Sequence, residues 1–240
     1  MKLPVLVLLV LLLLTCDPNR PAPGQAIASD TSLTVVGSME ATMRGDKLSG
    51  SIDLDTLQNR QGLYGLGPGE YLRGEVLVFD GRGYLSRVDG PDGMTVAETM
   101  QLRPPFFVYT HQRSWNEYTV PTDVRTLAQF VDYLDQLTIG DPRPFVYRLA
   151  GPLERAEIHL QNLPEGIVPE SPAEAHRGQQ TFTLTDRQVD ILGFFSTSHQ
   201  GIFTPLDSYV HMHLITRERD RMGHLDGVVF GEGMKLFLPE

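Results

Sequence analysis

Three histidines near the C-terminus have the spacing of a metal site built on paired strands. Residues 209–216, Tyr-Val-His-Met-His-Leu-Ile-Thr, alternate with period two, so His211 and His213 should share one face of a strand. The polar residues 217–220 suit a hairpin loop, which would set His224 opposite His213. Cross-strand neighbours have Cβ atoms roughly 4.5–5.5 Å apart. We therefore predict that the three imidazoles share a single ion.

The ligand types indicate a catalytic site that holds zinc. Zinc bound by three neutral imidazoles keeps a position open for water or substrate, whereas structural zinc sites commonly use four ligands that include cysteine. The single cysteine of the chain, Cys16, lies near the N-terminus, so the mature domain has neither a disulfide framework nor a thiolate catalyst. His111, His176 and His199 stand alone in polar or turn contexts, and we interpret them as non-ligands.

The N-terminal residues predict export. Residues 1–15 carry one lysine and an unbroken apolar run, which is shorter than the roughly 20 residues of a membrane span and is typical of a signal peptide. Leu-Leu-Thr-Cys at 13–16 resembles a bacterial lipobox, so we expect lipid on Cys16 and a place in the cell envelope or periplasm. Cleavage after 26–28, Ala-Ile-Ala, is the alternative and would give a secreted protein without lipid.

The composition limits the classes of partner. The 240 residues are 41% hydrophobic and 21% charged, as in a soluble globular protein. The formal net charge is −10 and no run of Lys or Arg interrupts it, which argues against nucleic acid and anionic membranes as partners. A small-molecule substrate is expected, with membrane contact through the lipid alone. A homodimer is left open.

Patterns of polarity and turn residues place the elements that must hold these groups. Residues 16–30 read as a flexible tether. Residues 75–84 predict a strand, a tight turn and a strand, and 124–137 have apolar residues at helical spacing. The β-rich remainder indicates an antiparallel barrel or sandwich. Its strands are expected at Phe145–Leu149, Glu157–Leu160, Thr181–Leu184, Val189–Phe195, Tyr209–Thr216, Leu225–Phe230 and Met234–Leu238.

At these residues the sequence resembles the α-acetolactate decarboxylases. Residues 209–216 followed by Gly-His-Leu-Asp at 223–226 are similar to the His-x-His and Gly-Gly-His zinc motif of that family, with equal spacing. Leu-Arg-Gly-Glu at 72–75 resembles the family's Leu-Asp-Gly-Glu and places its active-site glutamate on Glu75. Weaker similarities, such as Pro105-Phe106 and the terminal residues 236–240, extend the resemblance over residues 33–240.

The resemblance implies a fold and an activity. The fold would be a two-domain α/β (α+β) structure, with an N-terminal mixed β-sheet and helices in 31–140 and a metal-bearing antiparallel β-barrel in 141–240. The activity would be that of a carboxy-lyase: zinc-dependent decarboxylation of 2-acetolactate, or of a related 2-hydroxy-3-oxo acid, to acetoin and CO₂. Zinc would act as a Lewis acid on the ketone. Glu75 would act as acid or base, or bind the substrate hydroxyl.

Departures from the family pattern concern the catalytic residues. The family's active-site arginine falls on His159, and imidazole lacks the bidentate fork with which arginine holds a carboxylate. His159 could be a metal neighbour, a proton donor or an inert strand residue, and we hypothesise that His159 or Arg148 contacts the substrate carboxylate. The family's C-terminal glutamate maps to Glu240. Arg73 and Met222 replace an aspartate and a glycine of the two motifs.

Three other functions are compatible with the same residues. The first is another metal-dependent lyase or isomerase. The second is a cupin-type enzyme, although Pro205 stands where the cupin motif has glycine and Glu218 falls in the expected loop. The third is an exported lipoprotein that binds a metal or ligand without turnover. Metal content and activity without O₂ would separate them.

Overall fold

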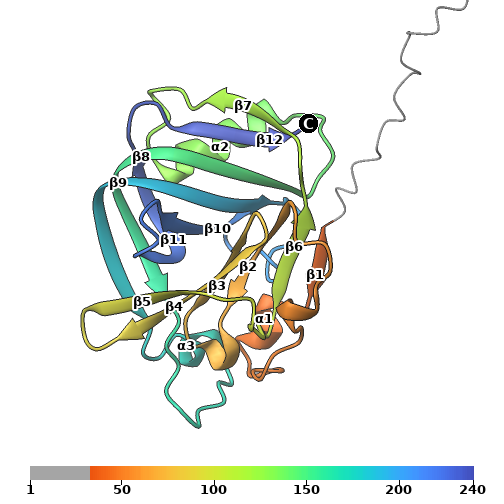
Figure 1. The fold of residues 1–240 in the computed structure, drawn as a ribbon, viewed down its shortest axis with the longest axis vertical. Helices are drawn as coiled ribbons and strands as arrows, with labels where there is room; N and C mark the ends of the chain where they lie inside the picture. Colours follow the sequence, from red (N-terminus) through yellow and green to blue (C-terminus); the bar gives the residue numbers. More distant parts are fainter. Residues whose placement is uncertain (1–32) are drawn as a thin grey trace, which may run out of the picture.

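The structure is a computed structural model that describes residues 33–240, so the expected signal peptide, Cys16 and the tether lie outside the described residues. Within that range, no helix has the length and apolar character needed to cross a membrane. The strands form two six-stranded sheets, and Figure 1 shows the second above the first. Every strand pairing in both sheets is antiparallel, whereas the resemblance implied a mixed first sheet.

The first sheet has the strand order β1-β6-β2-β3-β4-β5. Its strands are β1 (Thr34–Val36), β2 (Leu63–Pro68), β3 (Glu75–Phe79), β4 (Arg82–Asp89), β5 (Gly93–Glu98) and β6 (Phe107–His111). The predicted strand-turn-strand at 75–84 is confirmed. Asp80 and Gly81, with φ of 50° and 79°, form the two-residue turn that pairs Phe79 with Arg82. Two residues with positive φ match the twist of a tight hairpin.

The second sheet curls strongly. Its strands are β7 (Trp115–Thr119), β8 (Phe145–Leu160), β9 (Gln180–Phe195), β10 (Val210–Thr216), β11 (Met222–Phe230) and β12 (Lys235–Pro239), in the order β11-β10-β9-β8-β12-β7. β11 pairs with β10 and also with β8, so pairing runs round a circuit of four strands. Register shifts between Leu225 and Gly227 and between Val229 and Phe230 help to bend β11 toward β8.

Two long strands replace four short ones expected from the sequence. We expected interruptions at Gly151-Pro152 and near Asp186, because these residues are typical of turns. Instead β8 and β9 each run through 16 residues and pair along their length. Gly151 has φ of 149° and Asp186 φ of 51°, so the turn-forming residues bend continuous strands.

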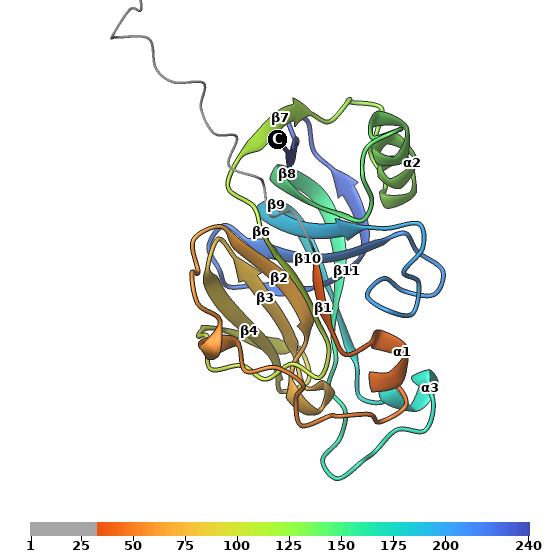
Figure 2. The same ribbon diagram turned by 90° about the vertical axis from the view of Figure 1, so that its right-hand side faces the viewer.

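Helix α2 (Leu127–Leu137) covers one face of the second sheet. Thr126 and Gln129 form a capping box at its N-terminus, which explains why the helix begins three residues after the predicted start at 124. Phe130 and Leu134 are fully buried in the core of this sheet. Two single-turn helices, α1 (Met39–Thr42) and α3 (Pro172–Ala175), lie on the same side of the molecule as α2 in Figure 2.

The opposite face of the second sheet packs against the first sheet. A second apolar cluster joins them, with Leu66 and Leu77 from the first sheet and Phe194 and Ile215 from the second. The chain passes from the first sheet to the second after His111. β7 and α2 therefore belong with the second sheet, although they precede residue 141, where we expected the second domain to begin. Residues 211 and 213 share the face of Ile215, which turns them toward the first sheet.

Candidate metal centre

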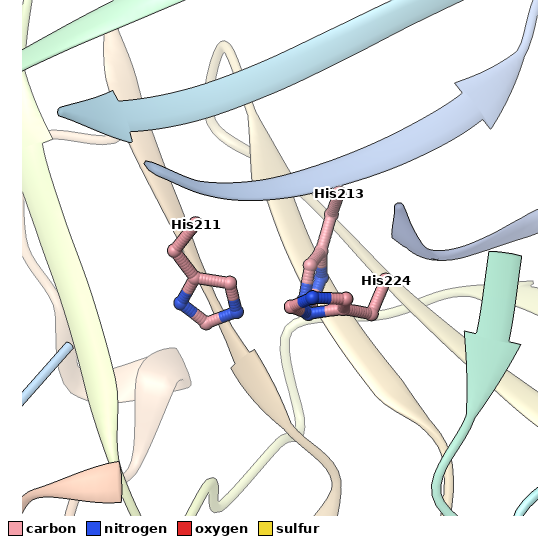
Figure 3. A group of neighbouring side chains, drawn as sticks. All are labelled: His211, His213 and His224. Atoms are coloured by element: carbon pink, nitrogen blue, oxygen red, sulfur yellow. The ribbon is translucent and has the colours of Figure 1, made fainter. Parts of the chain in front are cut away.

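The β10–β11 hairpin brings the three histidines together. His213 pairs with His224 in the register, and His211 lies two residues before His213 on β10. The ring centroids are 5.1 Å apart for His211 and His213, 4.9 Å for His211 and His224, and 5.6 Å for His213 and His224. One ring nitrogen from each lies within 4.8 Å of the others, and Figure 3 shows the three side chains together. The predicted convergence is confirmed.

Backbone carbonyls orient two of the rings. Nδ1–H of His211 donates to the carbonyl of Phe203 at 2.8 Å, and Nδ1–H of His213 donates to that of Val76 at 3.0 Å. Because a carbonyl can only accept, Nε2 of each ring carries the lone pair. Nε2 of His213 is buried and has no hydrogen-bond partner among the described residues. An unpartnered buried acceptor costs roughly 1–3 kcal/mol, so this donor set fits a cation.

Burial keeps the three imidazoles neutral. Burial lowers the pKa of His211 to about 3, and the positive charge of His159 acts in the same direction. Burial, followed by the charges of neighbouring histidines, holds the pKa of His213 and His224 well below the ordinary value. All three are therefore neutral near pH 7, which is the form that binds metal.

Glu75, the first residue of β3, lies against this group. Its side chain is buried, and Oε2 is 3.5 Å from Nε2 of His213 while Oε1 accepts the backbone N–H of Gln161 at 3.1 Å. Burial raises the pKa of Glu75 to about 8, although the positive charge of His159 opposes the shift. At neutral pH Glu75 therefore holds a proton that it can donate.

Gly74 fixes the start of β3. Its φ is +92°, and a Cβ there would lie 1.9 Å from the carbonyl oxygen of Ser86. The N–H of Gly74 also donates to the carbonyl of Gln161 at 2.6 Å. Glycine is required at this close approach, which sets the backbone from which Glu75 extends.

His159 lies beside the cluster on β8. It pairs with His224 in the register, and the two rings stack with centroids 4.6 Å apart. Nδ1 is 2.8 Å from both carboxylate oxygens of Asp226. Burial lowers the pKa of His159, but the hydrogen bond with Asp226 and the negative charge of Glu75 outweigh it and leave the pKa raised. His159, His224 and Asp226 also offer ligand atoms within 4.8 Å of one another, so His159 is a close neighbour of the metal group.

Sequence reasoning missed three residues of this site. Asp226 could have been found, because it follows His224 by two residues on β11 and alternation turns it toward the same face. Gln161 acts through its backbone N–H and leaves no sequence signal. His176, interpreted as a non-ligand, belongs to neither metal-ligating group, but its ring is 6.4 Å from that of His159 and its Nδ1 is 3.3 Å from Nε2 of Gln161.

His211, His224, Glu75 and His159 line a cavity of about 900 Å³ together with residues of α1, α2 and 205–210, whereas His213 is fully buried and is not one of the lining residues. Glu240 does not line it. That residue is exposed after β12, and its backbone N–H donates to the carbonyl of Ser114. The arrangement therefore gives no support to a catalytic role for Glu240.

Arg148 does not line the cavity either. Its guanidinium lies among four aromatic rings, at 4.5 Å from the ring centroid of Trp115 and 4.7 Å from that of Phe237. Nη1 donates to the hydroxyl of Tyr64 at 3.3 Å, which links the second sheet to the first. The structure assigns Arg148 to packing, so His159 is the remaining candidate for contact with a substrate carboxylate.

Comparisons with known proteins identify relatives of this chain. The family model described as alpha-acetolactate decarboxylase matches residues 33–236. The chain is 29% identical over 186 residues to the alpha-acetolactate decarboxylase of Klebsiella aerogenes, an alignment that covers 74% of this chain and 68% of that protein.

Solved structures share the fold. That of alpha-acetolactate decarboxylase from Bacillus subtilis strain 168 has a TM-score of 0.73 at 21% identity, covering 87% of this chain and 85% of that one. A Staphylococcus aureus protein of unknown function, similar to alpha-acetolactate decarboxylase, also gives 0.73, at 15% identity and with the same coverage of 87% and 85%.

Proposed function

The chain belongs to the alpha-acetolactate decarboxylase family of carboxy-lyases, and we propose that it converts 2-acetolactate, or a related 2-hydroxy-3-oxo acid, to acetoin and CO₂ with the help of a zinc ion. The observation that carries this proposal is the convergence of three histidines, two of them oriented by backbone carbonyls, with the buried carboxyl group of Glu75 at the wall of one cavity.

The residues present fit a zinc ion. His211, His213 and His224 would hold it through ring nitrogens, and three such ligands without cysteine are the usual set of a catalytic zinc site. Imidazole also suits copper, iron and nickel, so the donor set favours zinc without excluding them. When bound, zinc would supply Lewis-acid polarisation of the substrate's oxygen atoms.

Glu75 is the proposed proton donor. Loss of CO₂ breaks the bond between the carboxylate and the carbinol carbon, and it leaves an electron pair that the neighbouring ketone delocalises. Acetoin forms when one proton is added at the carbinol carbon. Glu75 is buried beside His213, and burial raises its pKa to about 8, so it can deliver that proton from one side and regain it from water.

His159 is the proposed contact for the substrate carboxylate. Among the described residues, neither lysine nor arginine lines the cavity. Asp226 holds Nδ1 of His159, which leaves Nε2 as the nitrogen that can reach a substrate. One imidazole N–H replaces the two parallel bonds of a guanidinium, so we expect weaker substrate binding than an arginine would give.

The test is to purify the full chain, measure bound metal and assay CO₂ release from 2-acetolactate. We expect activity that is lost on chelation and restored by zinc. Glu75→Gln should abolish most of the activity, and Glu40→Gln, an exposed carboxylate at the same cavity, is the matched control. Bound metal with no CO₂ release would favour the non-catalytic alternative.

The role of His159 has its own test. His159→Ala should raise KM for 2-acetolactate, because a carboxylate contact is lost. An unchanged rate and KM in this variant would overturn the assignment.

We also propose export with lipid on Cys16, which rests on residues 1–16 alone. Cys16→Ser should move the protein from the membrane fraction to the soluble envelope fraction. Unchanged fractionation would contradict the proposed lipid anchor.

A further inference from the structure

The cavity is much larger than 2-acetolactate requires. Its volume is about 900 Å³, at the upper end of the roughly 300–1,000 Å³ of pockets that hold drug-sized ligands. 2-Acetolactate has nine non-hydrogen atoms, and at roughly 30 Å³ for each water-sized atom it fills on the order of a third of that space. His211, His224, His159 and Glu75 occupy one part of the lining, so substantial space remains beyond the reacting atoms.

Apolar side chains line that additional space. Leu127 and Val131 lie one turn apart on α2 and face the cavity together, and Met39 of α1 and Met43, the residue that follows this helix, also line it. Leu206 adds a further apolar group and is 67% exposed. Figure 2 shows α2 and α1 on either side of the segment between β9 and β10, and residues of all three line the cavity. Methionines adapt readily to ligands of varied shape.

The charges around the cavity oppose a second anionic group on the ligand. Neither lysine nor arginine is among its described lining residues, whereas Glu40, Asp132 and Asp207 are exposed carboxylates there. A phosphate or a second carboxylate on the substrate would meet these negative charges with no compensating cation. The part of the substrate that extends from the reacting carbons should therefore be uncharged and apolar.

We propose that the preferred substrate is a 2-hydroxy-3-oxo acid with one carboxylate, in which an alkyl or aryl group larger than methyl packs against α2. This inference rests on the proposed function and leaves the reaction unchanged: CO₂ leaves, one proton is added, and the product is a longer acyloin. The apolar wall would take the larger group while Glu75 and the histidines act on the same three carbons.

The test compares kcat/KM across a homologous series with the full chain loaded with zinc. The series begins with 2-acetolactate. In the next three members one methyl group is replaced by ethyl, propyl or pentyl, and in the last member the added chain ends in a carboxylate. Burial of a methylene favours the transition state by roughly a factor of three to four. We expect kcat/KM to rise about that much for each methylene and to fall for the homologue with the terminal carboxylate.

A variant pair locates the apolar group. Val131→Phe narrows the cavity, and Gln136→Phe adds the same ring to an exposed position of α2 outside the cavity. We expect Val131→Phe to lower the ratio of kcat/KM for the pentyl substrate to that for 2-acetolactate at least tenfold, and Gln136→Phe to leave it unchanged. This ratio does not depend on the fraction of folded enzyme.

The outcomes separate the two proposals. If 2-acetolactate is a better substrate than every longer homologue, the inference is overturned while the proposed function stands. If the longer homologues are preferred but Val131→Phe does not alter the ratio, the placement against α2 is overturned. If no member of the series releases CO₂, the proposed function fails and the inference fails with it.

Discussion

Replacing Glu75 by glutamine should change how the stability of the metal-free protein depends on pH. Burial raises the pKa of Glu75 from 4.5 to about 8 in the folded protein. A carboxyl group with a raised folded pKa contributes stability below its unfolded pKa, and that contribution is lost as pH rises through the folded pKa. The wild-type protein should therefore lose stability through Glu75 between about pH 4.5 and 8.

The size of the effect follows from the same values. Each pH unit across this interval corresponds to roughly 1.4 kcal/mol, so the full difference is about 5 kcal/mol and serves as an order of magnitude. Glutamine keeps an oxygen for the N–H of Gln161 and has nearly the same volume. Any constant cost of the substitution cancels when two pH values are compared. The free energy of unfolding of Glu75→Gln relative to wild type should rise by several kcal/mol from pH 5 to pH 9.

The assay is urea unfolding of both proteins in the presence of a chelator at pH 5, 7 and 9, with Glu40→Gln as the exposed control. The three histidines have lowered pKa values and act in the opposite direction at acidic pH, but they are present in both proteins and cancel in the difference. A difference between wild type and Glu75→Gln that stays within about 0.5 kcal/mol across this range would refute the assignment of Glu75 as a buried, protonated acid.

Three further predictions concern the metal centre and its support. His213→Ala should lower bound zinc from one to near zero per chain, measured by mass spectrometry, whereas His111→Ala should not; equal retention would contradict the ligand assignment. Burial keeps the pKa of the three ligands low, so zinc affinity measured by chelator competition should fall less than about tenfold between pH 7 and pH 5. Three imidazoles with ordinary pKa values would lose affinity by a factor on the order of 10⁴ over the same interval. Gly74→Ala should lower the free energy of unfolding by about 2 kcal/mol more than Gly90→Ala, which has similar φ and open space around it; equal losses in denaturant titrations would argue against the close approach.

The hairpin that carries the histidines could be predicted because its signals are local. The alternation of 210–216 fixes which side chains share a face, and a polar loop of defined length fixes His213 opposite His224. The turn at Asp80-Gly81 could equally be predicted, because Asp-Gly is a sequence that adopts the two positive φ angles of a tight hairpin. The family resemblance then brought Glu75 to the site, which no local pattern could do.

The remaining features depend on contacts between distant segments. The carbonyl groups of Phe203 and Val76 orient the ligands, and backbone atoms have no signature in the sequence. The continuity of β8 through Gly151-Pro152 depends on its neighbours, which override the local preference for a turn. Glu240 was assigned by its position in the family pattern, and the path of β12 instead leaves it beside Ser114.

The hydrogen bond from Nδ1 of His213 to the carbonyl of Val76 means that both sheets are needed to form the candidate site. Val76 follows Glu75 directly on β3, so one short stretch of the first sheet supplies the acid and also orients a ligand on β10 of the second. A fragment that contained only the second sheet would keep all three histidines but would lose the acid and release one ring from its fixed orientation. The second sheet alone would therefore offer metal ligands without the acid, and the complete site depends on the packing of the two sheets against each other.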